Sequence, residues 1–296
     1  MRFGLVGTGP WARLTHGPGL VAAPGLELGG VWGRSTERAG RLAADLGTAS
    51  YPSYDDLLAD VDAVAFAVPP DVQVGLALSA ARAGKHLLLD KPVSTDPGTA
   101  RELVQAVEAA GVTTVVFFTD RFAPQWQAWH DETLRTGGWR GGWSRWLTSL
   151  DAGTNPFRES AWRRERGALW DIGPHVLSTL ASTLGPVTSL HAVGGAADTV
   201  TLSMTHEGGA TSTATLSLFA PPAANDRETT LWGEAGFSTM PGRRPGEDPA
   251  CLARAARQLA DAADAGERHP LDVAFGAEVV GWLSRAQVQL DTRTGS

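Results

Sequence analysis

The chain has 296 residues, 43% of them hydrophobic and 19% charged, which is typical of a globular protein with one large domain or two ordinary ones. The net charge of −7 and the lack of a basic run argue against nucleic acid as a partner, and the longest apolar stretch, near Val61–Val68, is too short to span a membrane. With a single cysteine, no expected metal site and no expected signal peptide, the sequence favours a cytoplasmic protein that acts on a small-molecule substrate.

The first dozen residues predict a strand, a glycine turn and the start of a helix. The strand Arg2–Val6 is followed by Gly7-x-Gly9-x-x-Ala12, in which the glycines allow a tight turn and a close approach of the backbone to a pyrophosphate. The helix N-terminus would present free N–H groups to the phosphates. An ordinary glycine turn is the alternative interpretation, but the preceding strand favours a dinucleotide site. The expected cofactor contacts here are Gly7, Thr8, Gly9, Pro10 and Trp11.

The end of the second predicted strand, Leu26–Trp32, bears on the choice of cofactor. An acidic residue at this point binds the ribose hydroxyl of NAD, whereas a nearby arginine accommodates the 2′-phosphate of NADP. The chain has no acid at the strand end and instead offers Arg34, Ser35 and Arg38. We therefore expect NADP, with NAD still possible. In the alternative interpretation, Arg34 stacks on the adenine and Arg38 is a solvated helix charge.

The remainder of the first 119 residues alternates strands with helices, which predicts a doubly wound parallel sheet. Strands are expected at 62–68, 86–89 and 112–118, and helices at 35–46, 54–58, 72–83 and 99–110, with Asp71 starting the third of these. Ligands bind at the carboxyl ends of such strands. One crevice should therefore be lined by Gly7–Ala12, Gly33–Arg38, Pro69–Gln73 and Asp90–Pro92, with Val68, Pro69, Pro70, Gln73, Asp90 and Lys91 among the cofactor contacts.

Lys91 is the first candidate for chemistry, because it directly follows an apolar strand at the ligand end of the sheet. Its ammonium could donate to a carbonyl oxygen and stabilise developing negative charge, while Asp90 orients it or contacts the nicotinamide ribose. A plain loop lysine is the competing interpretation, and spacing alone does not separate the two.

Residues 120–296 predict a second, α+β domain with an open and mainly antiparallel sheet. The pattern indicates mostly helix over 120–138, a strand at 143–150, a polar loop at 151–168 and a helix at 175–184. Alternating strands are expected at 187–193, 199–206, 210–219 and 228–232, and helices close the chain at 250–265 and 273–290. The loop carries Arg163 and three other arginines that could bind an anionic or hydroxylated substrate, or could be solvated.

Asp171 and His175 lie four residues apart at the start of a predicted helix, so they can face the same way. A histidine titrates near neutrality and could donate a proton to a substrate oxygen, with Asp171 fixing its tautomer. In the alternative interpretation, Asp171 caps the helix and His175 is an ordinary surface or core residue. Trp162 and Trp170 flank this segment, and their faces would suit a sugar ring or a flat apolar substrate.

Taken together, these motifs resemble the glucose–fructose oxidoreductase/inositol dehydrogenase (Gfo/Idh/MocA) family along the whole chain. The resemblance is carried by Gly7-x-Gly9-x-x-Ala12, Val68-Pro69-Pro70, Ala83-Gly84-Lys85-His86, Asp90-Lys91-Pro92, Asp120-Arg121-Phe122-x-Pro124, Trp162-Arg163 and Asp171-Ile172-Gly173-Pro174-His175.

The resemblance implies that Lys91 is the family's catalytic lysine, and that Asp171 and His175 face the substrate across the nicotinamide. Substrate contacts would come from Arg121, Trp162, Arg163 and Trp170. The resemblance also suggests a homo-oligomer, a dimer or tetramer, formed through the C-terminal sheet. Three departures matter: Asp90 replaces the usual Glu, Gln73 stands where many members have an aromatic residue or histidine, and the chain is shorter than most members.

The resulting hypothesis is an NAD(P)-dependent oxidoreductase that moves hydride between the nicotinamide and a carbonyl or alcohol carbon of a sugar-like or cyclic substrate. We picture an NADPH-dependent reduction. The alternatives are a reductase of an imine or enone in specialised metabolism, a non-catalytic NAD(P)-binding regulator, and a redox-neutral lyase or glycosidase that uses the cofactor transiently.

Overall fold

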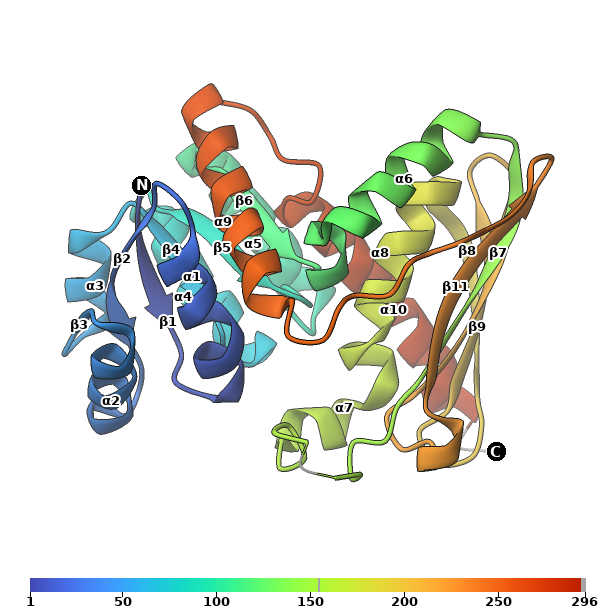
Figure 1. The fold of residues 1–296 in the computed structure, drawn as a ribbon, viewed down its shortest axis with the longest axis horizontal. Coiled ribbons are helices and arrows are strands. Elements are labelled where there is room, and N and C mark those ends of the chain that lie inside the picture. Colours follow the sequence, from blue (N-terminus) through green and yellow to red (C-terminus); the bar gives the residue numbers. More distant parts are fainter. Residues whose placement is uncertain (154, 294–296) are drawn as a thin grey trace. The chain divides into compact units, whose positions relative to one another are not determined.

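The computed structural model describes residues 1–153 and 155–293 and divides into two compact units (Figure 1). The first unit comprises Met1–Ala123 and Arg244–Val280, and the second comprises Pro124–Arg243 and Gly281–Ser296. A domain division at residues 1–119 and 120–296 remains our proposal from the sequence, and the compact units add that Arg244–Val280 packs with the N-terminal part. None of the described helices is long and apolar enough to cross a membrane.

The first unit is an alternation of strands and helices followed by a returning helix. Its elements are β1 (Arg2–Val6), the π-helix η1 (Ala12–His16), α1 (Gly17–Ala22), β2 (Glu27–Trp32), α2 (Thr36–Leu46), β3 (Ala49–Ser50), α3 (Tyr54–Asp60), β4 (Ala63–Phe66), α4 (Pro70–Arg82), β5 (His86–Asp90), α5 (Pro97–Ala110), β6 (Thr114–Phe117), the 3₁₀ turn η2 (Thr119–Phe122) and α9 (Asp248–Ala265).

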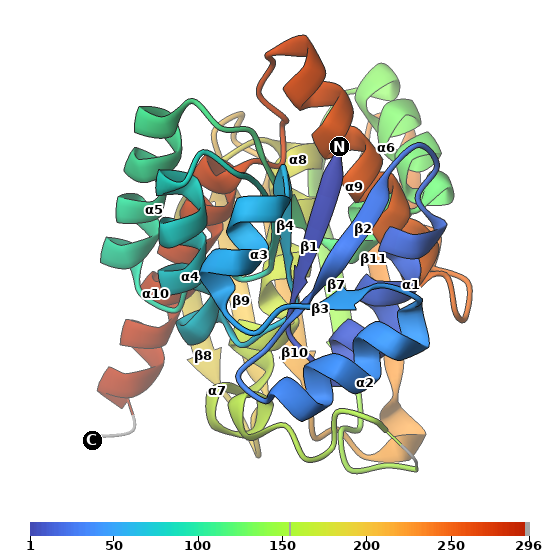
Figure 2. The ribbon, with the colours of Figure 1, turned by 90° about the vertical axis from the view of Figure 1, so that its left-hand side faces the viewer.

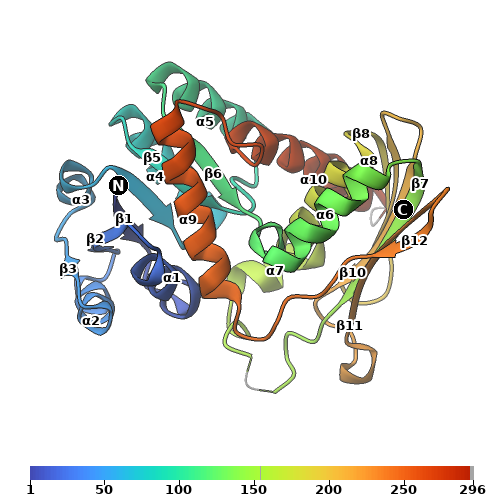
Figure 3. The ribbon, with the colours of Figure 1, turned by 45° about the horizontal axis from the view of Figure 1, so that its top comes forward.

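The sheet of this unit is wholly parallel, with strand order β3-β2-β1-β4-β5-β6, so the expected doubly wound sheet is confirmed (Figure 2). Its central strands are buried on both faces, and every residue of β4 is inaccessible to solvent. Helix α9 packs beside α1 and against β5 and β6, which explains why residues far along the chain belong to this unit (Figure 3).

The first helix departs from a regular α-helix. The backbone N–H of Gly17 donates to the carbonyl of Ala12, five residues back, and this π turn precedes Pro18. Proline has no N–H and its ring collides with the carbonyl four residues earlier, so a regular helix could not pass through it unchanged. Helix α4 also starts two residues earlier than expected: Pro69, not Asp71, is at its N-cap, and Asp71 lies in the first turn, bonded to the Thr95 hydroxyl.

The second unit combines a mixed sheet with helices. Its elements are α6 (Pro124–Thr136), β7 (Trp139–Leu147), α7 (Ala161–Asp171), α8 (Gly173–Leu184), β8 (Val187–Gly194), β9 (Val200–His206), β10 (Thr211–Ser217), the 3₁₀ turn η3 (Pro222–Ala224), β11 (Asp226–Gly233) and β12 (Gly236–Thr239); α10 (Val273–Arg293) begins in the first unit and ends in the second.

The strand order of the second sheet is β12-β11-β7-β10-β9-β8, and all neighbours are antiparallel except β7 and β10. The expectation of a mainly antiparallel sheet is confirmed. Burial alternates along β9, and α8 packs on β7 and β10, with α6 beside it (Figure 1). The sheet therefore has one face covered by helices and one that carries exposed polar side chains.

One predicted loop is partly a helix. Residues 151–168 were expected to lack regular structure, but α7 begins at Ala161, with the Ser160 hydroxyl accepting a hydrogen bond from the backbone N–H of Arg163. The helix is broken at Gly167, whose φ of 63° lies in the left-handed region that glycine tolerates. This kink and the arginine-rich composition hide the helical period in the sequence.

Candidate cofactor and active site

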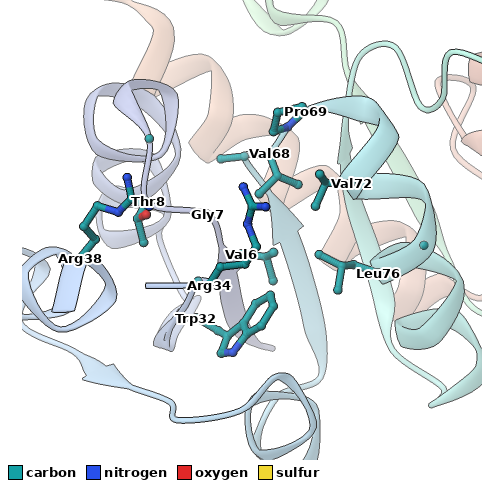
Figure 4. Close-up of a pocket in the computed structure, with 14 residues that line it drawn as sticks. Val6, Gly7, Thr8, Trp32, Arg34, Arg38, Val68, Pro69, Val72 and Leu76 are labelled. Atoms are coloured by element: carbon teal, nitrogen blue, oxygen red, sulfur yellow. The ribbon is translucent and has the colours of Figure 1, made fainter. Parts of the chain in front are cut away.

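A pocket of about 500 Å³ opens at the carboxyl ends of β1, β2 and β4 in the first unit (Figure 4). This is a size typical of ligand sites, and the position is where doubly wound sheets bind ligands. Its lining residues are Val6, Gly7, Thr8, Gly9, Trp32, Gly33, Arg34, Arg38, Ala67, Val68, Pro69, Val72, Gly75 and Leu76.

The two glycines of the turn have different surroundings, as the fingerprint requires. A Cβ on Gly7 would lie 2.4 Å from the carbonyl oxygen of Ala67, and its φ of 125° is one that other residues rarely adopt. A Cβ on Gly9 would meet no described atom within 4 Å. Gly7 is therefore needed for the turn itself, whereas Gly9 borders open space that a pyrophosphate can occupy. The turn fits a dinucleotide.

Two arginines give the pocket its charge. Arg34 extends from the end of β2 into the pocket, and Arg38 lies near Thr8 (Figure 4). Neither guanidinium forms an ion pair with any residue in 1–153 or 155–293. The nearest acid in the sequence, Glu37, pairs with Arg41 one turn further along α2. The Ser35 hydroxyl accepts a hydrogen bond from the backbone N–H of Arg38 at 3.3 Å, so it caps α2 beside the pocket.

The opposite wall of the pocket is apolar. Val68, Val72 and Leu76 face Arg34 across it (Figure 4). Trp32, the last residue of β2, also lines the pocket, and its ring lies 5.0 Å from that of Tyr54. Val72 falls within the expected crevice segment Pro69–Gln73, whereas Trp32 and Leu76 were not expected from the sequence, although the same strand-end rule that selected Arg34 could have selected Trp32.

Part of the expected crevice lies outside this pocket. Pro10, Trp11, Ser35, Pro70, Gln73, Asp90 and Lys91 are not among its lining residues. Gln73 in particular is fully buried: its amide nitrogen donates to the carbonyl of Asp90 at 2.9 Å, and its amide oxygen accepts the Asp90 N–H at 2.8 Å. Gln73 therefore fixes the backbone at the end of β5, which is a supporting role rather than a direct cofactor contact.

Lys91 follows β5 directly and is partly exposed. Its backbone N–H donates to Oδ1 of Asp90 at 2.8 Å. Lys91 and Lys85 are the two lysines of the chain, whose 25 basic residues are otherwise arginines. Lys91 therefore places a compact ammonium, rather than a guanidinium, at this strand end.

In the second unit, Asp171 and Arg163 form a partly buried ion pair. Nε of Arg163 lies 2.9 Å from Oδ2 of Asp171, and the two side chains are 22% and 9% exposed. The guanidinium also lies over the ring of Phe157, 4.3 Å from its centre. Asp171 is the last residue of α7, and Ile172 occupies the N-cap of α8. The alternative interpretation of Asp171 as a helix cap is therefore wrong.

His175 lies in the first turn of α8 and packs against an aromatic face. Its ring centre is 5.3 Å from that of Trp146 on β7, and the guanidinium of Arg227 lies 3.7 Å from the Trp146 ring centre. The structure thus brings His175, an indole and a cation together, a grouping that includes two residues the sequence analysis did not select. Asp171 and His175 lie on either side of the junction between α7 and α8.

The two tryptophans expected to contact substrate differ in their surroundings. Trp170 is 2% exposed, and its indole N–H donates to Gln287 at 2.9 Å, which favours a packing role. Trp162 is only partly buried, and its indole nitrogen has no hydrogen-bond partner among the described residues. Of the two, Trp162 is better suited to meet a ligand.

Arg121 is buried in the first unit, on the 3₁₀ turn after β6. Burial lowers the pKa of its guanidinium to about 9. His269 lies near it and stacks on Phe122, and burial together with the Arg121 charge lowers the pKa of that imidazole to about 4. His269 is therefore neutral at physiological pH, so that Arg121 keeps the only positive charge of this pair.

Two family models match the amino-acid sequence of this chain. Residues 1–118 match the model of the Gfo/Idh/MocA oxidoreductase family with an NAD-binding Rossmann fold, and residues 98–238 match the Gfo/Idh/MocA C-terminal domain. The two matches together extend over residues 1–238, through both compact units. The chain belongs to the Gfo/Idh/MocA family.

Named relatives of this Gfo/Idh/MocA protein include sugar-nucleotide enzymes. A UDP-N-acetylglucosamine 3-dehydrogenase from Acidithiobacillus ferrooxidans is 33% identical over 42% of this chain and 39% of its own. A dTDP-3,4-didehydro-2,6-dideoxy-alpha-D-glucose 3-reductase from Streptomyces antibioticus is 31% identical over 66% of this chain and 59% of its own. The matched segments thus span two-fifths to three-fifths of these relatives.

The structural similarity to known proteins covers more of the chain than the sequence similarity does. The solved structure of the UDP-N-acetylglucosamine 3-dehydrogenase from Acidithiobacillus ferrooxidans superposes with a TM-score of 0.83 at 22% identity, covering 99% of this chain and 98% of that one. A likeness at this level of identity shows a shared architecture in both units.

Proposed function

We propose that this Gfo/Idh/MocA protein is an NADPH-dependent oxidoreductase that reduces a carbonyl carbon of a sugar-like or cyclic substrate to an alcohol. The observation that supports it most directly is the cofactor pocket. Its described lining residues include two arginines without ion-pair partners and no acidic residue. An adenosine 2′-phosphate would satisfy both positive charges, and the ribose 2′-hydroxyl of NAD would find no carboxylate among the described lining residues to accept its hydrogen bond.

The proposed roles divide between the two units. Gly7, Thr8 and Gly9 would hold the pyrophosphate, and Arg34 with Arg38 the 2′-phosphate. The nicotinamide, when bound, supplies the hydride and its two electrons. Lys91 would donate to the substrate oxygen and stabilise its developing charge. His175, held against Trp146, would supply or relay the proton that completes the alcohol.

A sugar-like substrate is supported by the surroundings of His175 and by the relatives. Trp146 presents an aromatic face beside an imidazole, and Arg163 and Asp171 offer polar groups on the same pair of helices. The two named relatives act, by their names, at position 3 of a nucleotide-linked sugar. The proposal therefore includes a hydroxyl-rich ring, whose neighbouring hydroxyls would be bound by such groups.

A homo-oligomer through the second sheet is a further part of the proposal. Large apolar side chains are exposed on three strands of that sheet, Val193 on β8, Trp232 on β11 and Phe237 on β12. Exposed apolar side chains on a sheet are often covered by a second subunit.

The cofactor proposal is tested by thermal unfolding in the presence of NADP⁺, NADPH, NAD⁺ and NADH at equal concentrations. A ligand that binds the folded state raises the midpoint in proportion to the logarithm of its concentration over its dissociation constant. We expect larger shifts with NADP(H). Larger shifts with NAD(H) would overturn the cofactor proposal.

The reaction proposal is tested by following NADPH absorbance with a panel of keto-sugars, cyclic ketones, imines and enones. We expect net NADPH consumption with a keto-sugar or cyclic ketone. Consumption only with imines or enones would replace the proposed substrate class. Substrate turnover without net NADPH loss would indicate a redox-neutral enzyme, and binding without turnover of any compound would favour a regulator.

A further inference from the structure

His16 is a buried polar side chain in the first unit that the proposed chemistry leaves unused. It is 0% exposed, and neither ring nitrogen has a hydrogen-bond partner among the described residues. Its ring is enclosed by aromatic neighbours: the ring centres of Trp11 and Phe117 lie 6.0 Å and 5.7 Å away, both in edge-on geometry. Burying an imidazole without a partner is unfavourable, so its retention in this position calls for a reason.

The backbone around His16 departs from a regular α-helix. His16 is the last residue of the π turn, in which the N–H of Gly17 bonds to the carbonyl of Ala12. One extra residue in a turn rotates the following helix by about 100°. The rotation is held further along, because a Cβ on Gly19 would lie 2.7 Å from the carbonyl oxygen of Pro249 and 2.8 Å from Cβ of Leu252 on α9. The helix therefore cannot turn back without losing this close packing.

The group that His16 faces is the carboxylate of Asp90. Nε2 of His16 lies 3.6 Å from Oδ2 of Asp90, whose side chain is 13% exposed. The other oxygen, Oδ1, accepts the backbone N–H of Lys91, and Gln73 holds the Asp90 backbone on both sides. Hydrogen bonds therefore hold the Asp90 backbone and its Oδ1 atom, and His16 lies beside the remaining oxygen, Oδ2.

We propose that His16 is a positioning residue for Lys91. Its Nε2–H donates to Oδ2 of Asp90 and thereby keeps Oδ1 on the Lys91 backbone, which sets where the ammonium emerges from the end of β5. The observed separation of 3.6 Å is a few tenths of an ångström longer than a hydrogen bond, so a small movement of the carboxylate closes it. The consequence for catalysis rests on the proposed role of Lys91, but the contact itself does not.

The two-lysine composition allows a test without substrate or cofactor. In a Lys85→Arg background, ¹⁵N-lysine labelling leaves one backbone amide signal, that of the N–H which donates to Asp90. His16→Met and His16→Gln are straight side chains of similar size, and only Gln carries an N–H donor. We expect His16→Met to shift the Lys91 signal and to speed its hydrogen exchange about tenfold, and His16→Gln to restore both.

The control is His86→Met, at the opposite end of β5, which should leave the Lys91 signal in place. An unchanged signal in folded His16→Met would overturn the proposal, and so would an equal shift in His16→Gln. If His16→Met does not fold, Asp90→Asn tests the same contact from the other side. With ¹⁵N-histidine, Asp90→Asn should move the Nε2 signal of one of the seven histidines, and no movement would contradict the contact.

The kinetic consequence separates this proposal from the proposed function. With a turnover substrate in hand, His16→Met should lower kcat about tenfold while the dissociation constant of NADPH stays within about threefold, because a misplaced catalytic group affects the transition state more than ground-state binding. Turnover that is unaffected despite a shifted Lys91 signal would leave the contact standing and overturn the positioning role of His16 in catalysis, whereas the catalytic role of Lys91 itself is tested by Lys91→Ala.

Discussion

Arg34 and Glu37 are three residues apart at the start of α2, yet only the arginine belongs to the cofactor pocket. Glu37 forms an ion pair with Arg41, one turn further along α2. Its carboxylate is therefore not among the lining residues of the pocket. Arg34 stays exposed without a partner among residues 1–153 and 155–293. At this scale, the cofactor preference depends on which charges are already neutralised within the protein.

Arg34→Ala should therefore weaken NADPH binding about tenfold and change NADH binding less than about twofold, because only the former loses a charge-assisted hydrogen bond. Nicotinamide fluorescence titrations give both dissociation constants. Arg41→Ala removes an equal charge from the adjacent helix α2, outside the pocket, and serves as the matched control. Equal losses for the two cofactors in Arg34→Ala would assign Arg34 to the adenine rather than to the 2′-phosphate.

At the scale of elements, regular patterns in the sequence were sufficient for most of the fold. The parallel strands are short apolar runs between helix signals, and the antiparallel strands alternate, so both sheets could be predicted. The parallel pairing of β7 with β10 could not, because it joins segments separated by α7, α8, β8 and β9. Edge strand β12 has four residues and begins with a glycine, too little for a strand pattern.

Some of the site residues could likewise be predicted from the sequence, and others could not. The glycine turn and Arg34 follow from local rules, whereas the supporting role of Gln73 and the direction of His16 depend on contacts between distant segments. His16 is the last residue of a π turn, which is followed by Pro18 and by a helix that packs closely against α9. Helix α7 escaped prediction because its kink at Gly167 interrupts the apolar period.

The junction of α7 and α8 provides a test at this scale. Arg163→Gln should destabilise the protein by about 2 kcal/mol, because it removes a charge-assisted hydrogen bond to the largely buried Asp171 carboxylate. Adding Asp171→Asn should recover part of the loss, and urea unfolding of the single and double variants measures this coupling. Arg164→Gln breaks an exposed pair with Asp151 and should change stability by less than about 0.5 kcal/mol. Additive losses in the double variant would show that the pair is not coupled.

At the scale of the whole molecule, each compact unit supplies one part of the proposed chemistry. The first unit holds the dinucleotide pocket and Lys91, and the second holds His175 with its aromatic and ionic neighbours. Hydride transfer to a carbonyl requires a proton donor at the oxygen as well as a cofactor beside the carbon. We therefore expect the cofactor to bind normally when a group that acts on the substrate oxygen is removed, and turnover then to fail.

The most direct test compares Lys91→Ala with Lys85→Ala, the only other lysine substitution that the chain allows. NADPH oxidation with the best substrate of the panel, together with NADPH titration, gives kcat and the cofactor dissociation constant for each variant. We predict that Lys91→Ala lowers kcat at least about a hundredfold with NADPH affinity largely kept, and that Lys85→Ala behaves as the wild type. Turnover by Lys91→Ala at the wild-type rate would contradict it.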